Sequence, residues 1–454
     1  MNSVPDIGAA DRVCMLGRVW LERGRDEAAF AHLHQALALD PEHPEAHRQL
    51  AYWHVRRNDV LPALDHMGKA VATAPPEGPL RQEYARLRQL AGFGHPPVDL
   101  PDYPQGRLKF RTRYERTHHR SGWRDAVEAL HPLHNAGGVL FESFLEDPFA
   151  VEHPRSGIRG GSELLQGLRG RSYETRLTSE ELRVVPFREP WIGFLHNPPG
   201  MPRWFHYDKS PQTIFAKQVW QESLRHCRGL FALSEHLAGW LREATGKPVS
   251  ALIHPTARPS MMFDFERFMA NPRKAVVQVG WWLRSLSAIY RMPIAAGDPI
   301  GYRKLRLVPD FAAGADAHLR ELLARECAAI GLAINTDRSD VEPWAHLAND
   351  AYDALLAENI VFIELYDASA NNTVIECIAR GTPLLVNPLP AVVEYLGAGY
   401  PLYCLDAVDA AAKAMDVERL RATHEYLLGC DIRAKLDPGY FRRSFEASEV
   451  YQQL

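Results

Sequence analysis

The sequence predicts an α/β protein in which two doubly wound parallel domains follow an α-helical module. Two observations predict this fold class. A seven-position pattern near the N-terminus recurs after 34 residues, as in stacked helical hairpins. From residue 108 onward, short apolar runs alternate with helix-length segments, which is typical of parallel sheets. The length of 454 residues suits two or three domains.

A stretch rich in proline and glycine, residues 92–104, separates the two regions and is typical of a linker. The expected organisation is a helical module over 1–95, a linker over 96–106, a first α/β domain over 107–260 and a second over 261–454.

The composition excludes several classes of protein. The net charge of −4 gives no bulk electrostatic support for nucleic-acid binding. The N-terminus lacks the pattern of a secretory signal, and no apolar run reaches membrane-spanning length. The six cysteines are scattered without a C-x-x-C pair, which argues against a disulfide framework and a cysteine zinc site. We expect a cytoplasmic protein with no transmembrane segment and no nucleic-acid partner.

The N-terminal repeat positions combine small residues, where paired helices approach closely, with a closing proline. The first copy comprises Leu16, Gly17, Trp20, Ala29, Leu33, Ala36 and Pro41, and the second Leu50, Ala51, His54, Ala63, Met67, Ala70 and Pro75. The spacing resembles two tetratricopeptide repeats, and a further helix over about 80–90 is expected to cap them.

Two repeats are fewer than the three or so that a free-standing array needs. One interpretation is therefore a docking surface for a protein or peptide on residues 10–93. The other is a structural cap or a homodimerisation arm. The sequence leaves both open.

The first α/β domain shows the expected alternation. Strands are predicted over 139–145, 191–195, 229–233 and 249–254, and helices over 123–130, 212–226 and 235–245. Ligands of such sheets bind beyond the carboxyl ends of the strands. His196 and Asn197 stand at such an end, and Pro198 and Pro199 hold an open loop after them.

The second α/β domain contains the most informative segment. Strands are predicted over 275–279, 305–309, 360–365 and 384–386, and helices over 315–329, 342–356, 373–380 and from 417 onward. The polar turn 367–372 leads into the helix that carries Glu376. Free backbone N–H groups and the positive helix end favour an anion at this turn. A carboxylate one turn into the helix can accept hydrogen bonds from a ribose diol.

The segment from Ile360 to Tyr403 resembles the nucleotide-sugar site of GT-B glycosyltransferases, whose two domains are Rossmann-like. The resemblance implies that Glu376 holds the donor ribose and that Asn371, Asn372 and Thr373 face the diphosphate. It also implies a glycine turn and a basic residue after the first strand of the domain, which Gly280 and Arg284 match. Arg291 is the second candidate. A guanidinium can grip phosphate oxygens bidentately.

On the same resemblance, His196 contacts the donor sugar and is the catalytic candidate, with Asn197 as a second contact. A surface histidine in a rigid turn is the alternative. The basic turn 118–122 is interpreted as a surface turn, in which Gly122 is the position where an acceptor could approach the start of a helix. The final helix is expected to return to the first domain.

The resemblance has a gap. Many retaining members carry two glutamates seven residues apart, and Ala368 stands where the first would fall. The sequence therefore leaves retention or inversion open. It lacks the Asp-x-Asp motif of metal-dependent transferases, so we expect no metal and no cofactor beyond the nucleotide sugar as co-substrate.

The predicted function is transfer of a sugar from a nucleotide-diphosphate donor to a protein, glycan or lipid-linked acceptor. Two alternatives stay open. One is a nucleotide-sugar epimerase of the same fold, which needs acid/base carboxylates in the cleft. The other is a non-catalytic scaffold that works through its repeats.

Overall fold

The computed structural model describes most of the chain. The described residues are 8–23, 25–56, 60–72, 80–81, 83–84, 100–110, 122–149, 187, 189–294, 298–307, 315–336, 339–344 and 347–454. They fall into two compact units, one within 1–96 and 147–186 and the other within 97–146 and 187–454.

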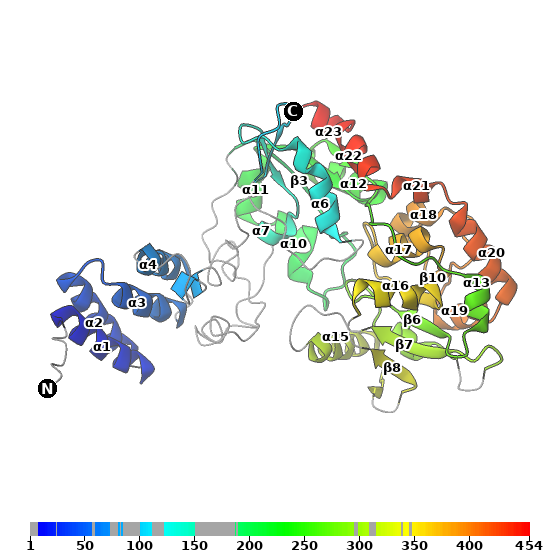
Figure 1. Ribbon diagram of the computed structural model, residues 1–454, viewed down its shortest axis with the longest axis horizontal. Coiled ribbons are helices and arrows are strands. Elements are labelled where there is room, and N and C mark those ends of the chain that lie inside the picture. Colours follow the sequence, from blue (N-terminus) through cyan, green and yellow to red (C-terminus); the bar gives the residue numbers. More distant parts are fainter. Residues whose placement is uncertain are drawn as a thin grey trace. The chain divides into compact units, whose positions relative to one another are not determined.

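The first unit contains two helical hairpins (blue in Figure 1). Their helices are α1 (Ala9–Glu22), α2 (Asp26–Leu39), α3 (Pro44–Arg56) and α4 (Val60–Ala72). The repeat positions Ala29, Leu33, Ala63 and Met67 are fully buried. A Cβ on Gly17 would lie 2.7 Å from the Leu33 side chain, so the repeat glycine permits the close approach of α1 and α2. The predicted capping helix over 80–90 lies largely outside the described residues.

The second unit contains two parallel sheets. The first sheet comprises β1 (Leu108–Phe110), β2 (Val139–Glu142), β3 (Trp191–Phe194), β4 (Cys227–Ala232) and β5 (Val249–Ala251), which lie side by side in chain order. Its connections include α6 (Trp123–Leu130), α7 (Glu146–Phe149), α10 (Pro211–Phe215), α11 (Gln218–Leu224) and α12 (Glu235–Thr245). The single helix predicted over 212–226 is wrong, because the extended backbone of Lys217 separates α10 from α11.

The second sheet has the order β10-β9-β6-β7-β8. Its strands are β6 (Ala275–Gln278), β7 (Arg303–Leu307), β8 (Val341–Trp344), β9 (Ile360–Ile363) and β10 (Leu384–Val386). The accompanying helices are α13 (Phe265–Ala270), α14 (Ala288–Arg291), α15 (Ala315–Ile330), α16 (Asn349–Ala357), α17 (Asn372–Arg380), α18 (Pro390–Leu396), α19 (Ala407–Ala414) and α20 (Val417–Leu428).

The helix predicted over 342–356 is wrong in its first part. Residues 341–344 form β8, which pairs with β7, and the helix begins only at Asn349. β8 is the edge strand of its sheet, where Pro343 costs no ladder hydrogen bond on the open side.

The last helices, α21 (Ile432–Lys435), α22 (Pro438–Glu446) and α23 (Glu449–Gln452), end at the first sheet (red in Figure 1). α22 packs against α6, and α23 packs against β4 and β5. Phe441 and Phe445 are fully buried in the core of this sheet. A Cβ on Gly229 of β4 would lie 2.6 Å from Val450, so α23 lies directly on the strand.

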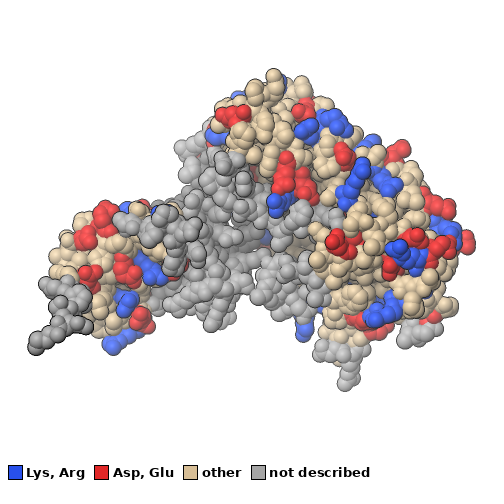
Figure 2. Space-filling model, viewed as in Figure 1, with Lys and Arg blue, Asp and Glu red and all other residues tan. Residues whose placement is uncertain are grey.

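The predicted fold class is therefore confirmed: two parallel α/β sheets follow a module of helical hairpins. The visible face of the second unit carries charges of both signs side by side (Figure 2). No helix within the described ranges is long and apolar enough to cross a membrane.

Candidate functional site

The strand order of the second sheet places two loops together. β6 has β9 on one side and β7 on the other, so the chain reverses its direction of winding at this strand pair. Loops at such a reversal diverge and leave a crevice beyond the carboxyl ends of the strands. The loop after β6 carries Arg284, and the turn after β9 leads into α17. The sheet topology thus brings the two predicted halves of the anion site together.

Backbone hydrogen bonds fix the loop after β6 to the end of β9. The Ser285 N–H donates to the Glu364 carbonyl at 2.8 Å, and the Tyr366 N–H donates to the Leu283 carbonyl at 3.0 Å. Arg284 lies between these two bonds, so its backbone is held against the segment that precedes α17.

The Arg284 side chain is 7% exposed and reaches the start of α17. Its Nη2 donates to Thr373 Oγ1 at 2.8 Å and to Asn371 Oδ1 at 3.2 Å, and its Nη1 donates to the Trp282 carbonyl at 2.9 Å. Its Nε is buried and has no hydrogen-bond partner within the described part of the chain. A guanidinium has five N–H donors, so this one keeps donors to spare. Burial lowers the pKa of Arg284 to about 10, which still leaves it charged at neutral pH.

Gly280 makes room for this guanidinium. Its φ of 76° lies in the left-handed region, and a Cβ there would lie 2.6 Å from Arg284 Cζ. A side chain at position 280 would both strain the backbone and displace Arg284.

The start of α17 offers further polar groups. Asn371 is the N-cap residue, and its Oδ1 accepts from the N–H groups of Thr373 and Val374 at 3.0 and 3.3 Å. Asn372 is exposed. The Ser369 hydroxyl is buried and has no hydrogen-bond partner among the described residues. A buried hydroxyl and a buried guanidinium nitrogen at one helix N-terminus are suited to bind an anion.

Glu376 lies deeper than the sequence suggests. It is 1% exposed, and its Oε2 accepts from the Tyr352 hydroxyl at 2.5 Å. Burial and the Glu376 carboxylate raise the pKa of Tyr352 well above its usual value, so the phenol stays a donor. A ribose diol that binds this carboxylate either shares it with the Tyr352 hydroxyl or takes the place of that hydroxyl, because a carboxylate oxygen can accept more than one hydrogen bond.

Arg380 and Asp353 form a fully buried ion pair below Glu376. The Arg380 Nη1 also donates to the Glu376 carbonyl at 3.1 Å. These contacts fix the middle of α17, from which Glu376 projects.

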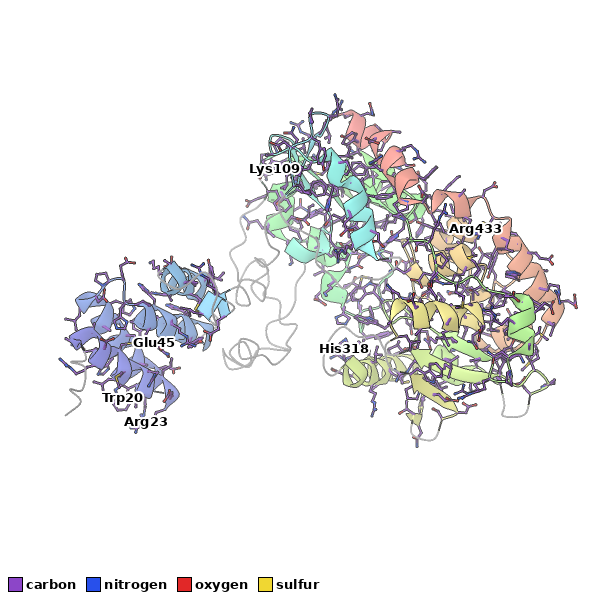
Figure 3. All side chains as sticks on the ribbon, viewed as in Figure 1. Trp20, Arg23, Glu45, Lys109, His318 and Arg433 are labelled. Carbon is purple, nitrogen blue, oxygen red and sulfur yellow. The ribbon has the colours of Figure 1, made fainter. Side chains whose placement is uncertain are left out.

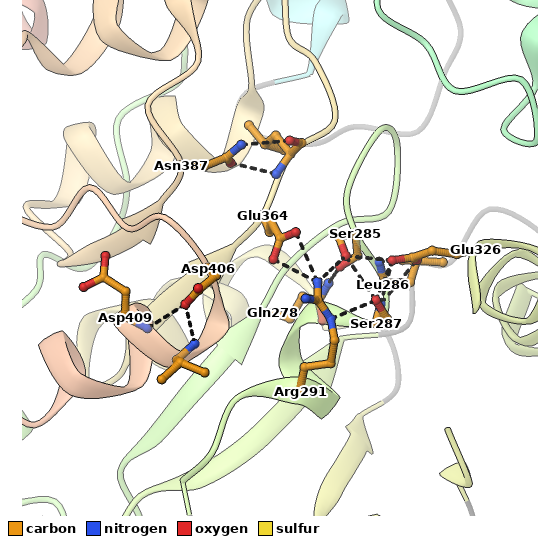
Figure 4. Close-up of polar contacts among 12 residues, drawn as sticks. Gln278, Ser285, Leu286, Ser287, Arg291, Glu326, Glu364, Asn387, Asp406 and Asp409 are labelled. Carbon is orange, nitrogen blue, oxygen red and sulfur yellow. Dashed lines mark hydrogen bonds and ion pairs between the residues drawn. The ribbon is translucent and has the colours of Figure 1, made fainter. Parts of the chain in front are cut away.

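A second buried carboxylate, Glu326 of α15, holds the chain just after Arg284 (Figure 4). It accepts from the hydroxyls of Ser285 and Ser287 at 2.7 and 2.6 Å and from the Leu286 N–H at 2.7 Å. Arg291 Nη2 lies 3.0 Å from a Glu364 oxygen and 3.2 Å from Ser285 Oγ. The second candidate for the phosphate therefore has a carboxylate partner, whereas Arg284 has none within ion-pair distance among the described residues.

His196 and Asn197 follow β3 of the first sheet. Both backbone N–H groups donate to Glu146 Oε1 at 2.6 Å. The His196 ring stacks on Phe144 with 4.2 Å between centroids and meets Trp123 edge-on at 4.5 Å. Its Nε2 lies 3.1 Å from the Ser143 carbonyl, which can only accept. Nε2 is therefore the donor in this hydrogen bond and carries a proton.

The loop after β3 contacts the second sheet's loops directly. Trp282 Nε1 donates to Asn197 Oδ1 at 3.1 Å, and the Gly200 N–H donates to Asp367 Oδ2 at 2.7 Å. Asn197 Nδ2 also donates to the Lys209 carbonyl at 2.9 Å. Asn197 thus joins the two sheets through Trp282, whose carbonyl accepts from Arg284.

Gly122 is the N-cap residue of α6 and precedes Trp123, the ring that packs on His196. The rest of the basic turn, residues 118–121, lies outside the described residues. The structure thus groups Arg284, Asn371 and Thr373 on the second sheet and joins Gly122 to His196 on the first.

Sequence reasoning missed Ser369, Tyr352, Trp282 and Asp367 as site residues. The pair Trp281-Trp282 directly after the glycine turn was the one sequence signal for Trp282, because exposed aromatic pairs in loops are unusual. Nothing in the sequence connects Tyr352 with Glu376. Among the described residues, no group of three or more His, Cys, Asp or Glu side chains is arranged to hold a metal ion.

Comparisons with known proteins add the following. No protein-family model matches the chain. No curated protein sequence matches it either. Several solved structures are similar over most of it. An O-GlcNAc transferase from Thermobaculum terrenum is 15% identical, with 97% of this chain and 89% of that chain covered and a TM-score of 0.39.

A sucrose-phosphate synthase from Thermosynechococcus elongatus is 14% identical, with 73% of this chain and 92% of that chain covered and a TM-score of 0.45. The HepE protein of Anabaena, solved with UDP and glucose, is 12% identical, with 61% of this chain and 74% of that chain covered and a TM-score of 0.42. What these proteins bind or transfer is a property of those proteins.

Proposed function

We propose that the protein is a glycosyltransferase that takes its sugar from a nucleotide-diphosphate donor bound at the start of α17. The observation that carries the proposal is the Arg284 guanidinium. It is 7% exposed, it has no carboxylate partner among the described residues, and its Nε is unbonded. A buried cation is normally paired, and an anionic ligand would supply the pair.

The geometry favours a diphosphate as this anion. The ligand would meet the Arg284 Nε, the Ser369 hydroxyl and the N-terminus of α17, which combine positive charge with hydrogen-bond donors. Glu376 lies one turn further along the same helix, where a group attached to the diphosphate would reach it. A ribose diol that replaces the Tyr352 hydroxyl fits that position.

The sugar would extend from the diphosphate toward the loop after β3. His196 and Asn197 lie in that loop, and Asn197 already contacts Trp282 beside Arg284. In this role His196 Nδ1 is the nitrogen that could accept a proton, because Nε2 donates to the Ser143 carbonyl.

We further propose that the acceptor is a protein or peptide that docks on the helical hairpins. A hollow of about 700 Å³ lies between the start of α1, the end of α2 and the start of α3. Asp11, His43, Glu45 and Arg48 line it, and Glu45 is labelled in Figure 3. Polar groups of both charges around an apolar floor suit a peptide segment.

The test is a thermal-shift titration of the full chain with nucleoside diphosphates, nucleotide sugars and inorganic pyrophosphate. We expect at least one nucleoside diphosphate to raise the melting temperature, with or without a chelator. Glu376→Gln should weaken that nucleotide by about tenfold while leaving pyrophosphate within about twofold, because only the ribose contact is lost. Equal losses for both ligands would make Glu376 structural.

Turnover separates the alternatives. Transfer to an acceptor, or slow hydrolysis of the donor, supports the transferase. Interconversion of free nucleotide sugars without transfer would identify an epimerase. Nucleotide binding without any turnover would favour a scaffold, the class to which Ala368 in place of the usual glutamate points.

A further inference from the structure

Backbone strain marks one place in the second unit. His206 and Leu283 have φ values of 39° and 55°, and they are the non-glycine residues with positive φ in the described part of the chain. Such conformations cost free energy and persist where the surroundings hold them, often at functional sites. His206 belongs to the loop region of the first sheet, and Leu283 follows β6 of the second. Both lie against Trp282.

Trp282 contacts residues of segment 196–210, which follows β3 of the first sheet, on several sides. Its Nε1 donates to Asn197 Oδ1, its ring stacks on His206 with 5.4 Å between centroids and 19° between planes, and the Lys209 ammonium lies 5.4 Å from the ring centroid. Phe205 meets the ring edge-on at 5.1 Å. One side chain of the second sheet thus holds residues 196–210 of the first.

Trp282 is also in contact with the anion site. Its carbonyl accepts from Arg284 Nη1 at 2.9 Å, and Leu283, with its strained backbone, is the single residue between them. A shift of the Arg284 guanidinium toward a ligand therefore acts on the same peptide segment that carries the Trp282 ring.

An apolar cluster surrounds this contact. Met201 and Phe205 of the first sheet's connection pack with Leu283, Leu286 and the α15 residues Leu319, Leu322 and Leu323. His318 of α15 (labelled in Figure 3) lies 5.5 Å from the His206 ring. A second tether lies nearby, since the Gly200 N–H donates to Asp367 in the turn that leads to α17.

We propose that Trp282 is a positioning residue that couples occupancy of the Arg284 anion site to the position of segment 196–210 against Trp282. An occupied anion site and this position of the segment stabilise one another, as thermodynamic linkage requires of coupled sites. The coupling holds His196 and Asn197 more firmly in place when the diphosphate is bound. The inference rests on the proposed function for the identity of the anion.

The experiment is hydrogen exchange followed by mass spectrometry on the full chain. The probes are whichever of UDP, GDP, ADP and CDP gives the largest thermal shift, and inorganic pyrophosphate. In the wild type, amides of 196–210 should exchange about fivefold more slowly with the site filled. In Trp282→Phe, which keeps a ring and the carbonyl but removes the indole N–H, this slowing should fall below about twofold. The dissociation constant should change less than about fivefold, the value of one neutral hydrogen bond.

Two further variants guard against a general loss of structure. Asn197→Ala removes the same hydrogen bond from the other side, and the double variant should lose no more coupling than either single variant. Trp281→Phe is the matched control. The Trp281 ring also packs on His206 and His318, but the hydrogen bond to Asn197 comes from Trp282. It should keep the ligand-dependent slowing.

The outcomes separate this inference from the proposed function. A nucleotide that binds without slowing exchange in 196–210, or equal slowing in wild type and Trp282→Phe, overturns the coupling alone. Slowing with pyrophosphate but no binding of any nucleotide supports the coupling and overturns the donor assignment. Binding of neither probe overturns both.

Discussion

The two sheets of the second unit have the same number of described strands in different orders, and only the second order reverses the winding and brings two loops together. The described strands of the first sheet lie in chain order from β1 to β5, so successive loops follow one another along the sheet. In the second sheet β6 lies between β9 and β7, and the winding reverses there. The loops after β6 and β9 therefore face each other, and Arg284 meets α17 at that point.

The polar groups of the two sheets differ accordingly. On the first sheet Glu146 Oε1 accepts from two backbone N–H groups of the loop after β3 and so fixes that loop. On the second sheet the Arg284 Nε and the Ser369 hydroxyl are buried and have no hydrogen-bond partner among the described residues. The first sheet thus supplies a loop that a carboxylate fixes, and the second a buried guanidinium at the start of α17.

Removal of the guanidinium should give the largest effect. Arg284→Met should weaken nucleoside diphosphate binding by about 100-fold, because charge-assisted hydrogen bonds to the phosphates are lost. Isothermal titration calorimetry measures this. Arg228→Met, at an exposed position of β4 in the first sheet, is the control and should bind normally. If Arg284→Met bound the nucleoside diphosphate within threefold of the wild-type affinity, Arg284 would not be the anion-binding group that sets the second sheet apart from the first.

A methyl group added at one closely packed glycine of each sheet should lower nucleotide affinity on the second sheet and stability on the first. Gly280→Ala forces a Cβ to 2.6 Å from Arg284 and should lower nucleotide affinity by about tenfold as the guanidinium shifts. Gly229→Ala forces a Cβ against Val450 on the first sheet. It should lower the free energy of unfolding by about 1–3 kcal/mol with unchanged affinity. Calorimetry and urea denaturation of both variants test this. Unchanged affinity in Gly280→Ala would contradict it.

Tyr352→Phe should shift stability and affinity in opposite directions. The loss of the hydroxyl leaves the buried Glu376 with one donor fewer and should lower the free energy of unfolding by about 1–2 kcal/mol. The same change removes the donor that competes with a ribose diol for Glu376 Oε2, so nucleotide affinity should rise by about twofold to fivefold. A fall in affinity would mean that Tyr352 positions Glu376 for the ligand.

A further effect concerns the pH dependence of stability and not nucleotide binding. Burial, followed by the charges of Lys209, His318 and Arg325, lowers the pKa of His206 to about 3. The unfolded chain therefore binds a proton at this residue below about pH 6.5 while the folded chain does not. The resulting stability is present above pH 6.5 and is lost progressively as the pH falls toward 3.

His206→Asn tests this contribution, because asparagine tolerates the left-handed backbone at this position. Urea midpoints at pH 7.5 and 5.0 should differ less in the variant than in the wild type. An equal difference in both proteins would show that His206 does not contribute to the pH dependence.

Much of the fold could be read from local signals. The helix over 235–245 agrees with α12 because Ser234 caps its start and Gly246 ends it. The strand over 384–386 agrees with β10 because a fully buried apolar run follows a glycine stop. The prediction failed at 341–344, where an edge strand with proline has no apolar periodicity, and at Lys217, where only packing divides a helical pattern.

The sequence by itself determined which segments could bind an anion. Two local patterns carry this information. One is a glycine turn before a basic residue, and the other is an asparagine cap before an amphipathic helix. Together with the resemblance to GT-B donor sites, they predicted that Arg284, Asn371 and Thr373 face the diphosphate.

Only the tertiary structure decided how those segments act together. Arg284 and Thr373 are 89 positions apart, and Trp282 and Asn197 are 85 apart. The strand order alone makes them neighbours. Packing likewise leaves Arg284 without a carboxylate at ion-pair distance among the described residues, and it gives Glu376 its Tyr352 partner. Burial lowers the pKa of His206. Local sequence patterns carry no record of such distant contacts, because these depend on how whole sheets are wound and packed.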